Sequence, residues 1–444
     1  VIDGARMIAV YAFGASLTGN DIVVRGTREA ASDGRRGRAF DVEVGARLAL
    51  NNALVEDNRE IGIHLAGMGA SLVATDVVVR GTREQVSDGT GGRGINVQGG
   101  AQLALSRALI EDNRGAGLHI AMDASVEATD VVVRGTREQV SDGTDGRGIN
   151  VQTGAHVALS RALVEDNRTM GLLVDGSGTN VEVTDVVVRG TREQASDNRA
   201  GRGINVENGA QLVLTRALID DNRDSGLYVA AIGTSVEATD VTVRGTRERA
   251  ADGTGGSGIN VQFGAELTLS RAVVEDNHEG GLVASEVGTR VEASELSVRD
   301  TAPHASDGAL GCGVWAQSGA RVVISRARIE RSHMVGIGSL LDASVEAREV
   351  AVSGVDPSRC PADTCTGDSG GFGLVATFGG ALLATGFSVE QATLCGVLVG
   401  QDGSRPSALD LQRGVIDRSA VGACVQIDGY DTMRLRDGVE YRDV

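Results

Sequence analysis

Several residue types are scarce or missing in this sequence, and each absence narrows what the protein does. The 444 residues include no lysine, so every basic side chain is an arginine, and the net charge is −18 at pH 7. Binding to phosphates needs a basic face, so this balance argues against nucleic acid as a partner. No apolar run reaches the length of a membrane span, so we expect no transmembrane segment in this chain. Aromatic residues make up only 2%, which indicates a slim aliphatic core.

Cysteine is absent from the first 311 residues, and all five cysteines lie at or after Cys312. Cys360 and Cys365 lie close together in a proline-containing loop. A local disulfide, two free thiols and a zinc half-site are the three interpretations, and we favour the disulfide because no second Cys/His pair has ligand spacing. A disulfide would favour a location outside the cytoplasm. Cys312, Cys395 and Cys424 occupy non-equivalent positions, and the sequence does not pair them.

Glycine, by contrast, is abundant at 63 residues and marks an internal repeat. The segment from Gly94 to Arg147 returns with small changes from Gly148, Gly203 and Gly258 onward. The arginine that closes each VVVR-like run recurs every 54 or 55 residues, at Arg25, Arg80, Arg134, Arg189, Arg244 and Arg299. Self-similarity at a fixed period is the signature of a stacked repeat architecture. The repeat therefore predicts one rod rather than several globular domains.

Each repeat divides into two unequal turns, because GINV at Gly94 is answered by GLHI at Gly117 and by GINV at Gly148. Each turn carries three short runs that alternate apolar and polar residues, which is the pattern of a strand with one buried face. Helical periodicity is absent. The pattern predicts an all-β fold, a parallel β-solenoid of about sixteen coils with three strands per coil. The coil length favours the right-handed form over a left-handed hexapeptide helix.

Equivalent positions should stack into columns from coil to coil. The inner columns are apolar and alternate in size, with Leu105, Ala128, Leu159 and Val183 in one of them. Two outer columns alternate in charge, and these ladders should fix the register; they run Glu56, Arg80, Glu111, Arg134, Glu165, Arg189 and Asp76, Arg107, Asp130, Arg161, Asp185, Arg216. A third column of Thr82, Asn113, Thr136 and Asn167 is suited to satisfy backbone groups through amide and hydroxyl bonds.

The regularity of the repeat varies along the chain. We expect irregular opening coils over residues 1–50, regular two-coil repeats over 51–300, divergent coils with a long loop at 354–371 over 301–428, and a candidate C-terminal cap over 429–444. Val1 lies within an existing pattern, so we expect the chain to start inside a longer gene product. A signal or lipid anchor would then belong to a segment that is not in this chain.

Polar and aromatic side chains recur on the outer side of the GxNx runs. Amides with two aromatic rings offer hydrogen bonds and stacking to a glycan, and the alternative is a merely soluble outer face; the candidate binding residues are Asn96, Gln98, Asn150, Gln152, Asn205, Tyr228, Asn260, Gln262 and Trp315. His64 and His119 fall on the same column, where we expect them to face solvent. No histidine motif indicates a metal site.

Two further features are candidates for binding. An aliphatic stripe between the charge ladders is expected to be exposed, where it would serve lateral association or docking unless arginine stems cover it; it comprises Leu109, Val132, Leu163, Val187 and Leu218. Loops on alternate coils display Asp88, Asp142, Asp197, Asp252 and Asp307. Calcium is the one conceivable cofactor there. Solvated turns with local hydrogen bonds are the favoured interpretation.

With these repeats and columns, the chain resembles the right-handed parallel β-helix repeat proteins of the pectin-lyase-like superfold. It is similar to secreted or surface repeat proteins of myxobacteria-like bacteria. The resemblance implies the fold and an extracellular or cell-surface location. It does not imply a catalytic residue, because ladder carboxylates paired with arginine should stay ionised. We expect a non-enzymatic scaffold for a protein, a glycan or further copies, and the alternative is a divergent lyase or hydrolase acting on an acidic polysaccharide.

Overall fold

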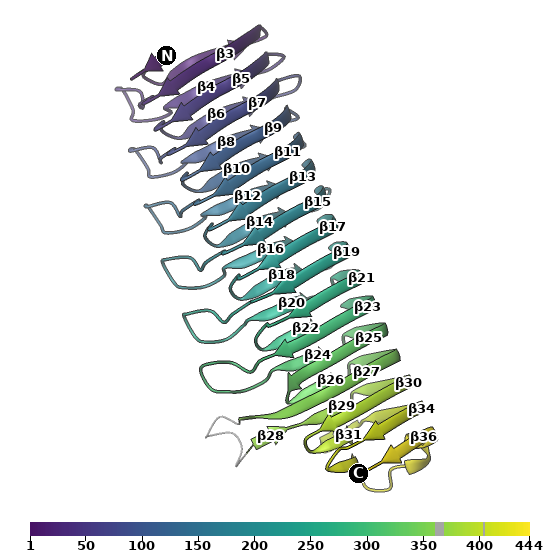
Figure 1. The fold of residues 1–444 in the computed structure, drawn as a ribbon. Helices are drawn as coiled ribbons and strands as arrows, with labels where there is room; N and C mark the ends of the chain where they lie inside the picture. The colour runs from purple at the N-terminus through teal and green to yellow at the C-terminus, as the bar shows by residue number, and fades with distance from the viewer. Residues whose placement is uncertain (360–367, 403–404) are drawn as a thin grey trace. The chain divides into compact units, whose positions relative to one another are not determined.

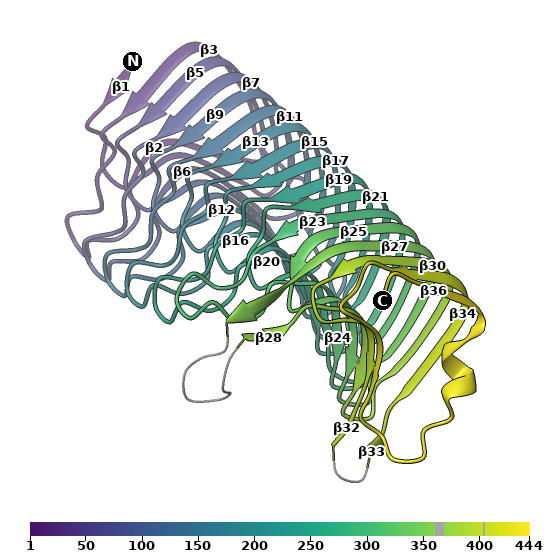
Figure 2. The same ribbon diagram turned by 60° about the horizontal axis from the view of Figure 1, so that its bottom comes forward.

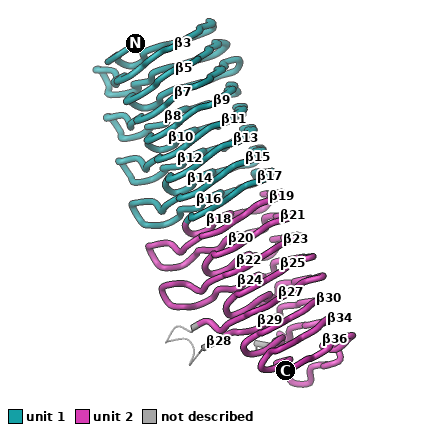
Figure 3. Tube along the Cα trace, in the orientation of Figure 1, with its two compact units in different colours: residues 1–222 teal, residues 223–444 magenta. Residues whose placement is uncertain are grey.

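The computed structural model describes residues 1–359, 368–402 and 405–444. Over these residues the chain contains strands, turns and one short 3-10 helix, η1 (Thr432–Leu435), and no α-helix. It forms two compact units, residues 1–222 and 223–444, which are shown in Figure 3 and are described one at a time. Among the described residues, no helix is long and apolar enough to cross a membrane.

Unit 1 alternates short strands of six residues with long strands of ten (Figure 1). The short strands are β2 (Ile8–Phe13), β4 (Arg38–Glu43), β6 (Ile61–Ala66), β8 (Arg93–Gln98), β10 (Ala116–Ala121), β12 (Arg147–Gln152), β14 (Met170–Asp175) and β16 (Arg202–Glu207). The long strands are β3 (Ser16–Arg25), β5 (Arg47–Glu56), β7 (Ser71–Arg80), β9 (Gln102–Glu111), β11 (Ser125–Arg134), β13 (His156–Glu165), β15 (Asn180–Arg189) and β17 (Gln211–Asp220), preceded by β1 (Ile2–Asp3).

Unit 2 continues the alternation with more variable lengths (Figure 2). Its short strands are β18 (Ser225–Ala230), β20 (Ser257–Gln262), β22 (Gly280–Ser285), β24 (Cys312–Gln317), β26 (Val335–Leu340), β29 (Phe372–Thr377), β31 (Cys395–Val399) and β35 (Val421–Val425). Its long strands are β19 (Ser235–Arg244), β21 (Glu266–Glu275), β23 (Arg290–Thr301), β25 (Arg321–His333), β27 (Ser344–Arg359), β30 (Ala381–Ala392), β34 (Ala408–Asp417) and β36 (Asp437–Arg442). Two small antiparallel pairs join β27 to β28 (Asp368–Gly370) and β32 (Gln401–Asp402) to β33 (Arg405–Pro406).

Within each unit, every strand of a coil pairs in parallel with its equivalent in the next coil. In unit 1, Arg134 on β11 pairs with Glu111 on β9 and with Glu165 on β13. The short strands do the same, and Leu118 lies between Ile95 and Ile149. Eight short strands in each unit give sixteen coils over the described residues. The predicted parallel β-solenoid of about sixteen coils is therefore confirmed.

Each coil contains two strands rather than the expected three, because the second and third predicted runs form one continuous long strand. In β9, the residues Leu103 and Leu105 before the bend and Ala108 and Ile110 after it are all buried. Strict alternation would turn the second half outward. Arg107 has a φ of 49°, and this single left-handed residue shifts the phase so that both halves face the core. The corner is therefore made inside one long strand.

The inner columns form the core in the predicted pattern. Leu105, Ala128, Leu159 and Val183 stack in register on successive long strands, and each is buried. Neighbouring positions alternate in the opposite sense, as in Ala108 and Val131. Large and small side chains therefore fill each coil to a similar volume, which supports close packing without wide aromatic residues.

The asparagine ladder ties one corner of every second coil to the coil before it. In unit 1, Thr136 N–H donates to Asn167 Oδ1 at 3.0 Å, and Asn167 Nδ2 donates to the Val133 carbonyl at 3.1 Å. Asn58, Asn113 and Asn222 make the same two bonds in unit 1. The predicted amide role is confirmed. The predicted hydroxyl role is wrong, because the buried Oγ1 atoms of Thr82 and Thr136 have no hydrogen-bond partner.

The glycine that opens each GxNx strand is required by this ladder. A Cβ atom on Gly94 would lie 2.6 Å from the Gly117 carbonyl oxygen and 2.8 Å from Asn113 Nδ2. Gly148 faces the same obstruction from Asn167 and Gly171. The recurring glycine is thus a matter of close backbone approach, and it leaves room for the side-chain amide.

The structure adds detail to three predicted segments. In residues 1–50, β3 pairs in register with β5, while more of β3 is exposed than of the later long strands. The predicted loop at 354–371 begins as the end of β27 and returns as β28, which pair antiparallel. The segment 429–444 holds η1 and the strand β36, which pairs in parallel with β34.

Replacing Asn167 by alanine tests the ladder. The change would leave the Thr136 N–H and the Val133 carbonyl buried without partners, so we expect a loss of about 2–4 kcal/mol in the free energy of unfolding. Urea unfolding followed by far-ultraviolet circular dichroism measures it. The matched control is Asn180→Ala, which removes an exposed bond to the Gly178 carbonyl and should change the midpoint little. Equal effects of the two substitutions would contradict the structural role of Asn167.

Candidate functional site

The outer face of the long strands carries the first charge ladder. In unit 1, Arg134 Nη2 lies 2.7 Å from Glu111 Oε2, and its Nη1 lies 3.9 Å from Glu165 Oε1. Arg80 contacts Glu56 at 2.8 Å and Glu111 at 3.9 Å in the same way. The predicted ladder is confirmed. Exposed pairs of this kind contribute about 0–1 kcal/mol each, so they select the register more than they stabilise the fold.

The second ladder lies at the corner inside the long strands. Arg107 donates hydrogen bonds to both carboxylate oxygens of Asp76, each at 2.7 Å. Arg161 donates to both carboxylate oxygens of Asp130 at 2.7 and 2.8 Å. These hydrogen bonds lower the pKa of Asp76 and of Asp130. In unit 2, Arg271 is bonded to Asp240 in the same arrangement. The carboxylates of this ladder are therefore held ionised and are poorly suited to act as general acids.

The aliphatic row between the ladders is half-buried rather than exposed as predicted. Val132 pairs in register with Leu109 and Leu163, so the row is continuous over these strands. All five predicted interface residues are half-buried; they are Leu109, Val132, Leu163, Val187 and Leu218. Their role as an interface stays a prediction.

The outer side of the short strands is more covered than predicted. Four of the candidate glycan-binding residues are buried, namely Asn96, Asn150, Asn205 and Tyr228. The other five are half-buried, namely Gln98, Gln152, Asn260, Gln262 and Trp315. At Asn96 and Asn205 part of the cover is an arginine, the first residue of β8 and of β16, which donates to the asparagine Oδ1 at 2.8 Å. Whether this face binds a glycan stays a prediction, but its accessible part is smaller than expected.

His64 and His119 are buried, which corrects the expectation that they face solvent. His64 Nδ1 lies 3.0 Å from Asn96 Nδ2, and His119 Nδ1 lies 3.0 Å from Asn150 Nδ2. Burial and nearby arginines lower the pKa of both imidazoles to about 3. Both rings are therefore neutral at physiological pH.

The two aromatic residues of this face in unit 2, Trp315 and Tyr228, also contact neighbouring side chains. Trp315 Nε1–H donates to Gln317 Oε1 at 3.0 Å, and its ring lies over Gly338, where a Cβ atom would come within 3.0 Å of the ring. Trp315 packs beside Cys312 and Val335 in an apolar cluster. Tyr228 accepts a hydrogen bond from Gln262 Nε2. Tyr228 is buried and Trp315 is half-buried, so both rings offer less surface for sugar stacking than predicted.

The loop aspartates make local turns, as the favoured interpretation predicts. Asp88 and Asp142 each accept the backbone N–H two residues further on, at 3.0 and 2.9 Å. Hydrogen bonds from Arg249 and Thr254 lower the pKa of Asp252 to about 2. Over the part of the chain that the structure describes, the loop aspartates form no cluster that could share a metal ion. In unit 1, a cluster that could hold a metal ion is formed by Asp41, Glu43 and His64.

A glutamate clip between loops was not foreseen from the sequence. Glu84 Oε1 accepts Val140 N–H at 2.8 Å, and Glu138 Oε1 accepts Ala195 N–H at 2.7 Å. Each clip joins a loop to the loop one full repeat further on. The recurring glutamate of the GTRE motif was the available signal, but sequence alone does not show which backbone group it bonds.

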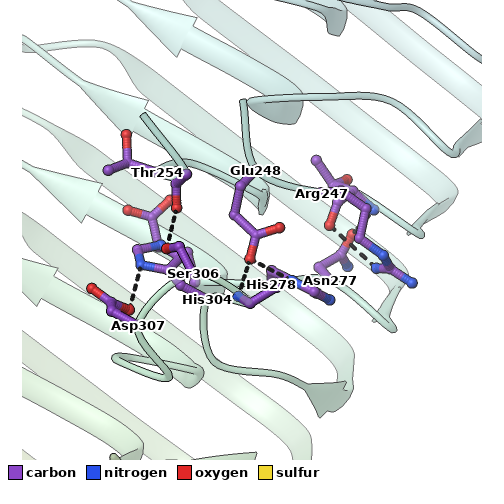
Figure 4. Close-up of polar contacts among 12 residues, drawn as sticks. Arg247, Glu248, Thr254, Asn277, His278, His304, Ser306 and Asp307 are labelled. Carbon is purple, nitrogen blue, oxygen red and sulfur yellow. Dashed lines mark hydrogen bonds and ion pairs between the residues drawn. The ribbon is translucent and has the colours of Figure 1, made fainter. Parts of the chain in front are cut away.

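In unit 2 this clip acquires a histidine (Figure 4). Glu248 Oε1 accepts Ala305 N–H at 2.7 Å and lies 2.6 Å from His278 Nδ1, where equivalent coils carry an arginine. Burial alone would raise the pKa of Glu248, but the bonds from His278 and Ala305 outweigh it and lower the pKa to about 2. Nearby, His304 Nδ1 lies 3.7 Å from Asp307 Oδ1. The repeat is therefore locally altered here without losing the clip.

The cysteines that the sequence left unpaired are now placed. Cys395 and Cys424 form a disulfide between adjacent short strands of unit 2, with Cα atoms 6.0 Å apart. Cys312 is a buried free thiol, and burial raises its pKa. The predicted pair Cys360 and Cys365 lies outside the described residues.

Comparison with known proteins agrees with this architecture. A family model for the right-handed β-helix region matches residues 142–298. No curated protein sequence gives a significant match. Similar solved structures include the Vag8–C1 inhibitor complex (16% identity, 99% of each chain covered, TM-score 0.45) and pectate lyase Pel9A (12%, 71% of this chain and 70% of that one, 0.34). Another is the catalytic unit of a GH87 α-1,3-glucanase from Streptomyces thermodiastaticus strain HF3-3 (13%, 86% and 65%, 0.36). At such identities the likeness does not extend to activity.

Replacing Glu248 by glutamine tests the altered clip. Because the pKa of Glu248 is lowered in the folded state, its stabilisation is present above its ordinary value of 4.5 and is lost as pH falls towards about 2. We expect Glu248→Gln to cost on the order of 2–3 kcal/mol near neutral pH and progressively less below about pH 4.5. Urea unfolding at several pH values measures the difference, with the exposed Glu237→Gln as control. A pH-independent difference would contradict the assignment.

Proposed function

We propose that this right-handed parallel β-helix repeat protein is a non-enzymatic extracytoplasmic scaffold whose long-strand face binds further copies of the chain side by side. The observation that carries the proposal is that the chemistry of this face recurs on every coil of the regular repeat. Glu111, Arg134 and Glu165 repeat one ladder contact, and Asp76 with Arg107 repeats the other. An enzyme's reacting groups are normally a single departure from such a repeat.

The face has the anatomy of a protein interface. The half-buried row through Leu109, Val132 and Leu163 is bounded on both sides by arginines and carboxylates. Interfaces commonly combine an apolar centre with a polar rim in which arginine is enriched. Because ladder charges neutralise one another within the chain, the net charge of −18 is not concentrated on this face.

The alternating ladders also favour a second copy as the partner. Signs alternate from coil to coil, so a copy displaced by one coil presents an opposite charge to each ladder member. Such complementarity specifies orientation and register more than affinity. Many equivalent weak contacts along the face would add through avidity.

A location outside the cytoplasm is supported by the disulfide between Cys395 and Cys424. Disulfides persist in oxidising compartments and are rare in the cytosol. The alternative of a polysaccharide-acting enzyme has less support on the long-strand face, since Arg107 and Arg161 hold Asp76 and Asp130 ionised.

Sedimentation velocity over a wide concentration range tests self-association. We expect wild-type chains to associate reversibly and the double variant Leu109→Glu/Leu163→Glu to remain monomeric, because it places charge on the apolar row. The control is Gln98→Glu/Gln152→Glu on the short-strand face, which should associate like wild type. Monomeric wild-type protein at every concentration would contradict the proposal. The release of unsaturated or reducing ends from acidic polysaccharides would overturn its non-enzymatic part.

A further inference from the structure

In unit 1, the column of outer positions that holds Asp41 on β4 contains no other acidic residue. Tyr11, Asp41, His64 and Asn96 stack in register on β2, β4, β6 and β8. Glu43 follows two residues after Asp41 and points to the same side of the strand. One ligand atom from each of Asp41, Glu43 and His64 lies within 4.8 Å of the other two.

One of these groups is buried with an unused oxygen. Asp41 is only 1% exposed, and its Oδ1 atom has no hydrogen-bond partner. Arg38 contacts the other oxygen, Oδ2, at 3.0 Å. Arg38 is itself held by both oxygens of Glu60, at 2.8 and 3.0 Å, so much of its charge is already neutralised. An unpartnered buried carboxylate oxygen is costly and points to a missing ligand.

We propose that Asp41, Glu43 and His64 bind one divalent cation of the borderline class, of which Zn²⁺ is the best match. Two carboxylates and one imidazole nitrogen are ligands that Zn²⁺ accepts. Calcium is disfavoured because it takes six to eight oxygen ligands. Tyr11 donates its hydroxyl to Glu43 Oε2 at 3.1 Å and thereby orients that carboxylate towards the site. The site lies on the short-strand face and is independent of the proposed self-association.

A relay of hydrogen bonds sets the state of His64. Arg93 Nη1 donates to Asn96 Oδ1 at 2.8 Å, which turns the Asn96 amide nitrogen towards His64 Nδ1 at 3.0 Å. By this network Nδ1 is the acceptor and the proton lies on Nε2. Binding a cation through Nε2 requires the proton to move to Nδ1, where it needs an acceptor. Metal-bound histidines usually find one in a carboxylate or carbonyl oxygen.

Asn96 is therefore a positioning residue that tunes the site. Replacing it by aspartate supplies a carboxylate that accepts from Arg93 and from His64 Nδ1–H at once. This substitution should favour the cation-binding tautomer. His119 and Asn150 provide a matched control, because they share the 3.0 Å contact without a carboxylate pair beside the ring.

Calorimetric titration of chelator-treated protein with ZnCl₂ and, separately, CaCl₂ tests the proposal. We expect one Zn²⁺ per chain and no comparable binding of Ca²⁺. Glu43→Gln and His64→Gln should each weaken Zn²⁺ binding by about 100-fold or more, and Asn96→Asp should tighten it by about tenfold. Asn150→Asp should change nothing. Glu43 is half-buried, so its variant should fold normally, which circular dichroism can verify.

Two results would overturn the assignment. The first is the absence of Zn²⁺ binding to the wild-type protein. The second is Zn²⁺ binding that Glu43→Gln and His64→Gln leave unchanged, which would show adventitious binding elsewhere. An Asn96→Asp variant that binds no more tightly than wild type would contradict the role of the relay. Self-association measured on the same variants keeps the two proposals separate, because none of these residues lies on the long-strand face.

Discussion

Parallel pairing in strict register is the constraint on which the rest of this structure depends. In the regular coils each strand pairs with its equivalents in the coils before and after it, so each side chain lies over its equivalent one coil away. Like charges stacked at about 4.8 Å would repel, and equally large side chains would not fit one coil. The alternation of Glu111 with Arg134, and of Leu105 with Ala128, is the response to that constraint.

Because equivalent residues stack from coil to coil, much of the structure could be predicted from the sequence. The fold, the coil count, the core columns and both charge ladders follow from a repeat of known period, because a column is only a list of equivalent positions. Features that depend on backbone direction inside one coil did not follow. The left-handed backbone conformation of Arg107 lets two predicted strands form one continuous strand. An arginine side chain does not indicate a positive φ, so the sequence did not predict it. The burial of His64 depends on neighbouring side chains such as Asn96, whose amide nitrogen lies 3.0 Å from His64 Nδ1.

Positions that follow the repeat and positions that depart from it suit two different kinds of function. A repeated surface acts through many equivalent weak contacts, and the long-strand face is of this kind. A site for one small ligand needs a local exception, and the grouping of Asp41 with Glu43 and His64 is such an exception in unit 1. In unit 2, His278 stands where equivalent coils carry an arginine and contacts Glu248, which keeps its bond to the next loop and whose pKa is lowered to about 2. The repeat therefore builds the scaffold, and a residue that departs from the repeat indicates where a site could lie.

Distances between spin labels within unit 1 test the register most directly. Arg47, His156 and Gln211 are exposed first residues of β5, β13 and β17 and belong to one column. Pulsed electron paramagnetic resonance on labelled pairs should give separations of about 19 Å between positions 47 and 156 and about 29 Å between 47 and 211, or about 4.8 Å per coil. Separations that do not grow in proportion to the number of coils would contradict the account.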